Sequence, residues 1–256
     1  GDFKEKYRIY PESVNQCEDS WVFMIKDGEK DRLAILGGAA ELFRGKAESG
    51  LVLAELNHEN ACALRKLFPF TAPSPVLKAD RTFGVGDRLG IACFGHIRVF
   101  KEYDARPVFA QQSVRELNLT KRTFGDVLDA ATFAVFREGF KKGFGADGDH
   151  LKKPDEIEAA LKEGYTMITL DLSEHIKKGE ASNLEIPEEI RKRYLNKVFA
   201  VEDEEIVFSE ADLRECLHVY GEALNYAAVI YHEYIAPAEG RINFEISIDE
   251  TETPTT

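Results

Sequence analysis

The residues best suited to chemistry in this sequence are an aspartate and a histidine that stand side by side, Asp149 and His150. They end the run GFGADGDH at residues 143–150, whose small and apolar residues predict a short buried strand. A strand end holds a side chain in a fixed direction, so the pair could supply a proton acceptor and a metal ligand to one site. A polar turn between a strand and a helix is the alternative, because a single Asp-His pair does not distinguish the two.

Polar residues also follow three other predicted strands, at the point where each strand ends. They are Gln111 and Gln112 after one apolar run, Asp171 with His175 after another, and Glu250 after the last. In a (β/α) barrel the active site is built at the C-terminal strand ends, and an open doubly wound sheet binds its ligand there too. Four polar strand ends in succession favour a barrel enzyme, with the two glutamines, Asp171 and His175 as candidates to bind substrate.

Asp149 and Glu250 form the best candidate pair for acid–base chemistry. Each ends a predicted strand, so the fold could bring both to one rim although they lie far apart in the chain. Two carboxylates whose environments differ can act as acid and base on one substrate. Glu250 fits equally well as an acid in the first turn of a helix, where the helix dipole favours it.

The glycine-rich run FGVGDRLG at residues 83–90 resembles a dinucleotide-binding loop only in part. Its spacing is G-x-G-x-x-x-G instead of G-x-G-x-x-G, and no apolar strand precedes it. The glycines more simply allow a tight turn that presents Asp87 and Arg88 as candidates to bind substrate, and Arg88 could hold a carboxylate or a phosphate. A structural Asp–Arg pair at that turn is the alternative.

The composition argues against several classes of partner. A net charge of −13 does not suit nucleic acid, since phosphate binding needs clustered Lys and Arg. The N-terminal residues lack the apolar run of a signal peptide, and no apolar run is long enough to span a membrane. The four cysteines are widely spaced, which suits reduced thiols. We therefore expect a cytoplasmic protein with a small-molecule substrate; the sequence predicts no oligomeric state.

The order of the predicted elements indicates two domains. Residues 1–75 hold a hairpin around the turn at 26–29, a strand at 51–56 and a helix capped by Asn57, typical of a small α+β domain. Over residues 76–256 strands and helices alternate, which predicts an α/β fold with a parallel sheet. We expect a TIM-barrel-like (β/α) domain there. About five βα units can be counted, short of the eight of a closed barrel, so the barrel is expected to be incomplete in this chain.

Capping residues predict where the helices of this second domain begin. Thr123 with an acid three residues later, Pro154 and Ser209 are each typical of a helix start. Thr253 and Pro254 suggest one more start just before the sequence stops. We therefore expect the sequence to be a fragment of a longer chain.

Several long segments together resemble one enzyme family. In chain order they are FGVGDRLG, AQQSVREL, TKRT, GFGADGDHLK, LDLSEH and SIDETETPTT, from about Phe83 to the last residue. This order is similar to that of the tagaturonate epimerase family. The resemblance implies a metal-dependent enzyme that interconverts the keto uronates tagaturonate and fructuronate in hexuronate catabolism. It also implies a barrel-like domain that continues past Thr256.

The resemblance assigns roles to three residues. It implies Asp149 as proton acceptor, His150 as a ligand of a divalent metal cation (Zn, Mn, Ni or Fe) and Glu250 as proton donor, with further ligands beyond the last residue. Gly148 stands where an alanine is expected and Leu172 where a proline is expected. An aldolase of a related keto sugar acid and a non-catalytic sugar-acid-binding fragment are the alternatives.

Overall fold

The computed structural model describes residues 6–179 and 184–248. The chain divides into two compact units, residues 1–169 with 240–243 and residues 170–239 with 244–256. The sequence predicts that residues 1–75 form a domain that folds by itself. A division into compact units does not test independent folding, so the boundary between residues 75 and 76 stays a prediction.

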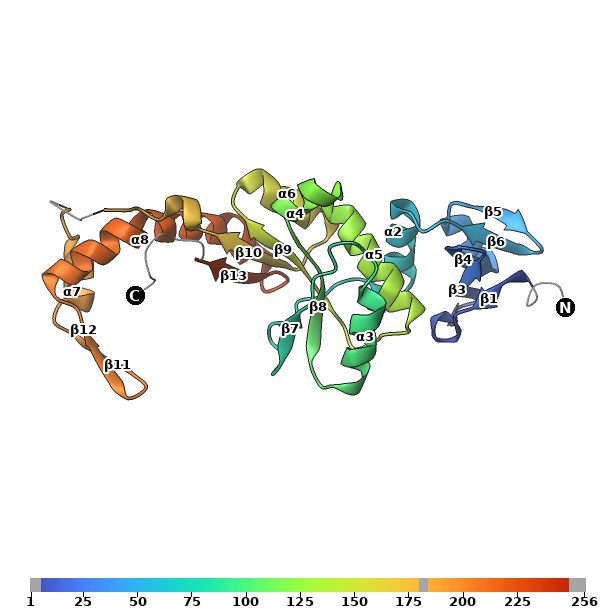
Figure 1. Cartoon of the computed structure of the whole chain (residues 1–256), viewed down its shortest axis with the longest axis horizontal. Coiled ribbons are helices and arrows are strands. Elements are labelled where there is room, and N and C mark those ends of the chain that lie inside the picture. The colour runs from blue at the N-terminus through green and yellow to red at the C-terminus, as the bar shows by residue number, and fades with distance from the viewer. Residues whose placement is uncertain (1–5, 180–183, 249–256) are drawn as a thin grey trace. The chain divides into compact units, whose positions relative to one another are not determined.

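The N-terminal part of the first unit is an antiparallel sheet (Figure 1). Strands β3 and β4 form the predicted hairpin, and Gly28 in its turn has φ +58, which glycine adopts without strain. Strand β5 was not predicted, because its residues are polar and exposed. The strand order is β1-β3-β4-β6-β5, with β2 also paired to β3, and the strands are β1 (Arg8–Ile9), β2 (Asn15–Cys17), β3 (Ser20–Asp27), β4 (Lys30–Leu36), β5 (Gly45–Glu48) and β6 (Leu51–Ala54).

One helix follows this sheet and begins where the sequence predicts. Helix α2 (His58–Leu67) starts after Asn57, whose side chain accepts a hydrogen bond from the backbone N–H of Asn60. Three short 3-10 turns complete this region, namely η1 (Pro11–Ser13), η2 (Gly38–Leu42) and η3 (Pro69–Thr71).

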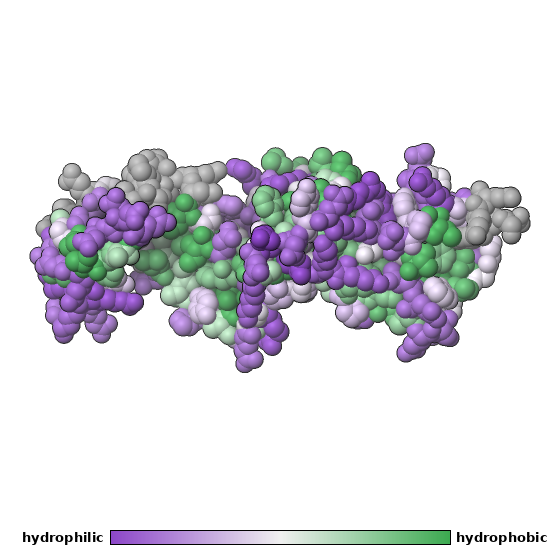
Figure 2. Space-filling model, turned by 90° about the horizontal axis from the view of Figure 1, so that it is seen from below, coloured by the Kyte–Doolittle hydropathy of each residue, from purple (hydrophilic) through white to green (hydrophobic). Residues whose placement is uncertain are grey.

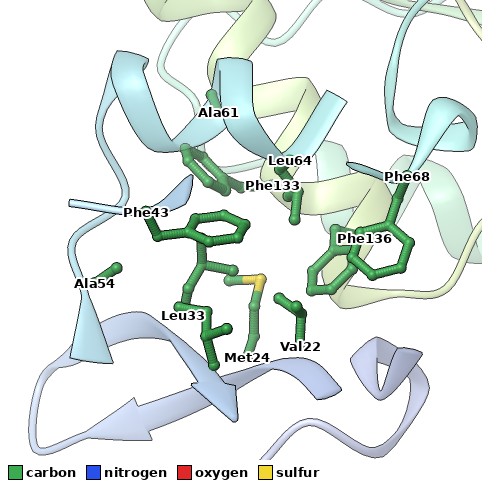
Figure 3. Close-up of a cluster of buried hydrophobic side chains, with 11 residues drawn as sticks. Val22, Met24, Leu33, Phe43, Ala54, Ala61, Leu64, Phe68, Phe133 and Phe136 are labelled. Carbon is green, nitrogen blue, oxygen red and sulfur yellow. The ribbon is translucent and has the colours of Figure 1, made fainter. Parts of the chain in front are cut away.

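A hydrophobic core joins the N-terminal sheet to two helices (Figure 3). Val22, Met24 and Leu33 point from the sheet toward α2, which contributes Leu64. Helix α5 (Phe124–Arg137) adds Phe133 and Phe136 to the same cluster. The first part of the chain therefore shares a core with a helix that comes after the predicted boundary.

The second sheet is the predicted parallel sheet. Its order is β13-β10-β9-β8-β7, so strands that follow each other along the chain are neighbours, and the pairs β7–β8 and β8–β9 are parallel. The strands are β7 (Thr82–Gly84), β8 (Arg106–Ser113), β9 (Gly145–Leu151), β10 (Met167–Asp171) and β13 (Asn243–Ser247). The predicted α/β pattern is confirmed, and among the described residues this sheet has five strands.

Helices connect these strands as crossovers. Ser113 and Thr123 form the capping boxes of α4 and α5, and Pro154 lies at the start of α6. The starts at Thr123 and Pro154 are those that the sequence predicts. The aromatic ring of Phe109 in β8 packs against Phe100 of α3. The remaining helices are α3 (Cys93–Glu102), α4 (Val114–Thr120) and α6 (Pro154–Glu163).

The second unit holds a hairpin that was not predicted and the long helix that was. Strands β11 and β12 pair antiparallel, and the rings of Phe199, Phe208 and Tyr194 pack together beside them. Ser209 caps the long helix, as expected. The elements are η4 (Ser173–His175), α7 (Glu188–Tyr194), β11 (Val198–Val201), β12 (Glu204–Val207), α8 (Glu210–Ile230), η5 (Tyr231–Ile235) and η6 (Ala236–Ala238).

The surface is mixed in character. On the face drawn in Figure 2, hydrophilic side chains cover most of the described surface and alternate with separate hydrophobic patches. Such a mixture is ordinary, because much of any folded protein's surface is apolar. Within residues 6–179 and 184–248, no helix is both long enough and apolar enough to cross a membrane.

Candidate functional site

The end of β9 holds the aspartate and histidine that the sequence singles out. Oδ1 of Asp149 lies 2.8 Å from Nδ1 of His150, and the two side chains are 13% and 37% exposed. His150 has φ +54, a left-handed conformation that is uncommon for a residue other than glycine. Such backbone conformations cluster at functional sites, where the surrounding structure maintains them. The pair is therefore fixed in position, partly buried and open to solvent on the imidazole side.

A second polar cluster lies on the same face of the sheet, two residues before Asp149. Asp147 is fully buried, and its carboxylate accepts hydrogen bonds from Nε2 of Gln111 (3.1 Å) and from the hydroxyl of Thr169 (3.0 Å). Side chains two apart in a strand share a face, so Asp147 and Asp149 point the same way. Asp147 and Thr169 were not predicted as site residues, although this alternation could have identified Asp147.

Gln112, adjacent to Gln111, points to the opposite face. Its buried amide donates to Oγ1 of Thr120 (2.9 Å) and accepts from Nη1 of Arg122 (3.0 Å). Gly148, its partner in β9, lies on this face too, because an added Cβ there would come within 2.7 Å of Leu151 and 3.3 Å of Ala160 in α6. The glycine at position 148 is therefore explained by close packing under α6, and Gln112 supports the α4–α5 turn.

The glycine-rich loop after β7 lies directly against the end of β8. A Cβ on Gly84 would come within 2.7 Å of the side chain of Gln111, and one on Gly86 within 2.6 Å of its carbonyl oxygen. Close approach of two backbones is one of the uses of glycine. The loop therefore places Asp87 and Arg88 beside the strand end that carries Gln111.

Within this loop, Asp87 stabilises the start of a helix. Its buried carboxylate accepts hydrogen bonds from the backbone N–H groups of Ile91 (3.1 Å), Ala92 (2.8 Å) and Cys93 (2.8 Å), where α3 begins. These N–H groups have no partner within the helix, and the helix dipole favours a negative charge there. The carboxylate predicted to contact substrate thus has three backbone partners of its own.

We expect Asp87→Ala to lower the free energy of unfolding by about 2 kcal/mol, because it removes a helix cap and leaves buried donors unsatisfied. Urea denaturation followed by circular dichroism measures the change. Asp80→Ala is the matched control, since Asp80 is exposed in the turn before β7. Equal stability of the two variants would show that the Asp87 carboxylate does not hold the helix in place.

Arg88 lies at the surface and pairs with Glu116 of α4. The distance from its Nε to Oε1 of Glu116 is 3.0 Å, and the arginine side chain is 48% exposed. Exposed pairs of this kind contribute about 0–1 kcal/mol to stability. Arg88 could therefore exchange this partner for an anionic ligand at little cost.

The other predicted site residues lie in the second unit or outside the described residues. Oδ1 of Asp171 accepts hydrogen bonds from the backbone N–H (2.8 Å) and the hydroxyl (2.6 Å) of Ser173. His175 stacks on Tyr226 with ring centroids 4.2 Å apart, and its Nδ1 lies 3.3 Å from Oε1 of Glu222. Hydrogen bonds from Lys177 and then from His175 lower the pKa of Glu222. Glu250 lies outside the described residues.

A metal site is not complete within the part of the chain that the structure describes. No group of three or more His, Cys, Asp and Glu side chains there could hold a metal ion. His150 is nevertheless arranged as one ligand of a metal ion would be, since metal-binding histidines commonly donate one ring N–H to a carboxylate. With Nδ1 bonded to Asp149, Nε2 is the atom that would coordinate a cation.

Comparison with known proteins identifies the family. Residues 10–256 match the family model of tagaturonate epimerase. The chain is 38% identical to the tagaturonate/fructuronate epimerase of Thermotoga maritima over 99% of its own length. The chain belongs to the tagaturonate epimerase family. The predicted resemblance is therefore confirmed.

Solved structures of a tagaturonate epimerase family member have the same fold. The glycerol-complexed crystal structure of the fructuronate-tagaturonate epimerase of Cohnella laeviribosi has a TM-score of 0.92 and 42% sequence identity, over 98% of this chain. The native structure of the same protein also has a TM-score of 0.92, with 41% identity over 99% of this chain. The chain covers 56% of the Thermotoga protein and 55% of the Cohnella chains, so it spans about half the length of the relatives it matches.

Proposed function

We propose that this chain is part of a metal-dependent enzyme that interconverts tagaturonate and fructuronate in hexuronate catabolism. The observation that carries the proposal is the Asp149–His150 pair, fixed at the end of β9 in a chain of the tagaturonate epimerase family. The names of the Thermotoga and Cohnella relatives support the substrates. Two structures of the Cohnella protein hold glycerol, which is itself a polyol, as a sugar acid is.

We also propose that the parallel sheet is part of a (β/α) barrel. Its strands follow one another in chain order with helical crossovers between them, as in that architecture. The polar strand ends would then lie on one rim of the barrel. The four cysteines are all free thiols, which supports a reducing cytoplasmic location.

In the proposed mechanism Asp149 takes a proton and Glu250 returns one. The epimerised carbon lies β to the ketone, so the carbonyl does not make its C–H acidic. A base acting on the hydroxyl of that carbon would instead break its bond to the carbon next to the ketone, which leaves an aldehyde and an enediolate. Re-addition of the enediolate to the other face of the aldehyde would give the epimer. Asp149 is the base that suits this step, because it lies at a strand end and is held by its bond to His150. Asp147, which is buried, and Gln111, which is half-buried, extend the polar face beside it.

His150 is the metal ligand that we propose within this chain. A divalent cation such as Zn, Mn, Ni or Fe would polarise the ketone and stabilise the negative charge that develops on its oxygen. We place the remaining ligands in the part of the longer relatives that this chain does not span. This proposal is supported by the hydrogen bond between Nδ1 of His150 and the carboxylate of Asp149, because metal-binding histidines usually have such a partner on the nitrogen that does not bind the metal.

Removing metal from the full-length protein should abolish activity. We expect dialysis against a chelator to lower kcat by about 100-fold or more, since a Lewis acid contributes several kcal/mol at the transition state. Activity should return when Mn²⁺ or Zn²⁺ is added. An undiminished rate in chelator, with metal content below one-tenth per chain by elemental analysis, would contradict metal dependence.

The ligand count is tested by titration. We expect the full-length protein to bind Mn²⁺ or Zn²⁺ at least about 100-fold more tightly than this 256-residue chain, because each missing ligand weakens the site. Equal affinity would show that the present residues already complete the site.

Product analysis tests the function itself. Tagaturonate is incubated with the full-length protein and Mn²⁺ or Zn²⁺, and the products are identified by NMR. Fructuronate is the expected product. Accumulation of cleavage fragments would instead show an aldolase that stops after bond breaking, and binding of the sugar acid without turnover would show a binding module.

A further inference from the structure

A cysteine, a histidine and an arginine meet on α2, away from the strand-end site. Sγ of Cys62 lies 3.5 Å from Nε2 of His58 and 3.2 Å from Nη2 of Arg65. His58 and Cys62 are four residues apart and Cys62 and Arg65 three, so the helix puts all three on one side. Figure 1 shows that this helix lies beside α5.

Helix α5 supplies the carboxylate that holds this cluster. Oδ2 of Asp129 lies 2.9 Å from Nδ1 of His58, and its Oδ1 accepts from Nη1 of Arg65, also at 2.9 Å. Nη1 of Arg65 donates to Oγ1 of Thr132 as well, at 3.0 Å. Asp129 thus orients the imidazole with Nε2 toward the thiol, and it fixes the guanidinium at the same time.

These contacts place a proton acceptor and a cationic hydrogen-bond donor at the sulfur of Cys62. A thiolate accepts a hydrogen bond from a guanidinium far better than a thiol does, and a neighbouring cation lowers the cost of forming it. His58 can take the thiol proton at Nε2, and the resulting imidazolium is stabilised by Asp129 and by Glu163, whose Oε2 lies 3.9 Å from Nε2. The thiol, the imidazole and the carboxylate are in the order that activates a cysteine nucleophile.

One side of the cluster is buried and the other side is exposed to solvent. The side chains of Arg65 and Asp129 are only 11% and 10% exposed, whereas that of His58 is 54% exposed. Cys62 itself is partly exposed. A small reagent can therefore reach the sulfur while the groups that activate it stay in place.

The other cysteines lack this setting. Burial raises the pKa of the Cys93 thiol well above its ordinary value, and burial is also the main cause of the raised pKa of Cys216. Among the contacts of the described residues, none brings a histidine or an arginine to the sulfur of Cys17. Cys62 is the cysteine whose sulfur has both an imidazole and a guanidinium within contact distance among the described residues.

We propose that Cys62 is a modification site that reacts, as a thiolate, with peroxides. In this step the sulfur attacks one oxygen of hydrogen peroxide, an S–O bond forms and the O–O bond breaks. The sulfur is oxidised by two electrons to a sulfenic acid, and the peroxide is reduced to water after the leaving hydroxide takes the proton held by His58. The proposal does not depend on the epimerase activity.

The test measures the rate at which each cysteine is oxidised. The chain is treated with hydrogen peroxide in the presence of dimedone, which traps sulfenic acids, and labelled peptides are quantified by mass spectrometry. We expect Cys62 to be labelled about 10-fold faster than Cys17 and Cys216. Labelling of Cys62 no faster than that of Cys17, which is also partly exposed, would overturn the proposal.

Two variants separate activation from mere exposure. His58→Gln should slow the labelling of Cys62 by about 10-fold, because it removes the proton acceptor while keeping a polar side chain at an exposed position. Glu59→Gln is the control, since Glu59 pairs with Arg44 and should leave the rate unchanged. Circular dichroism confirms that both variants are folded. An unchanged rate in His58→Gln would show that the imidazole does not activate the thiol.

Discussion

We expect Asp149→Asn in the full-length protein to lower kcat for the interconversion of tagaturonate and fructuronate by about 10²–10⁴-fold. Acid–base catalysis by a positioned side chain contributes rate factors of this size, and an amide cannot take the proton. The substitution keeps the shape of the side chain, and an amide oxygen can still accept from Nδ1 of His150, so binding of metal should survive. Steady-state kinetics on the metal-loaded variant, with metal content measured, provides the test.

The matched control for this variant is Asp155→Asn. Asp155 is an exposed acid in the first turn of α6, a few residues after Asp149 on the same crossover. The Asp155→Asn variant should keep full activity. If Asp149→Asn turned over as fast as this control, Asp149 would not be the proton acceptor. If it lost metal as well as activity, the carboxylate would act by positioning His150.

The second large effect concerns the core between the N-terminal sheet and α5. We expect Phe136→Ala to lower the free energy of unfolding by about 3–5 kcal/mol, because the ring is fully buried and its removal leaves a cavity. Its ring packs against Phe68 and Phe70, at centroid distances of 5.5 and 6.2 Å. Urea denaturation followed by circular dichroism gives the change. Phe83→Ala, which removes a ring that is 65% exposed, should cost less than about 0.5 kcal/mol.

This variant also tests the predicted domain boundary between residues 75 and 76. Phe136 lies after the boundary, but its ring belongs to the core of the N-terminal sheet. One cooperative transition that shifts as a whole in Phe136→Ala would show that residues 1–75 do not fold alone. A separate transition of the N-terminal sheet, unaffected by the substitution, would support an independent domain.

Features that depend on neighbouring residues could be predicted from the sequence. Asn57, Thr123 and Ser209 each cap the helix expected, because a cap needs only a side chain within three residues of its donor. The hairpin at Gly28 and the parallel sheet follow from turn chemistry and from the alternation of strands and helices in the same way.

Features that depend on contacts between distant residues could not be predicted from the sequence. Gln111 and Gln112 both end β8, and only the packing of α4 and α5 shows that the second faces the helices. Asp87 precedes α3 by six residues, beyond the reach of an ordinary capping pattern, so its three backbone partners were missed. The β11–β12 hairpin was missed because its turn, around Glu202 at φ +52, has no glycine to mark it.

The cluster at Cys62 shows the same difference within the candidate chemistry. His58 and Cys62 are both visible in the sequence, but Asp129 lies on another helix and the sequence does not predict that it joins them. From the sequence alone, His58 does not differ from an ordinary surface or core histidine. At β9 the strand itself presents Asp149 and His150 next to each other, so the sequence alone could identify the pair.

The most direct test of the proposed epimerase is one NMR time course in D₂O. Tagaturonate is incubated with the full-length protein and Mn²⁺ or Zn²⁺, and the epimerised carbon is observed as fructuronate forms. If Asp149 acts on a hydroxyl and the carbon–carbon bond is broken and formed again, the epimerised carbon of fructuronate keeps its original hydrogen. Deuterium on that carbon would contradict this mechanism, and the absence of fructuronate would contradict the function.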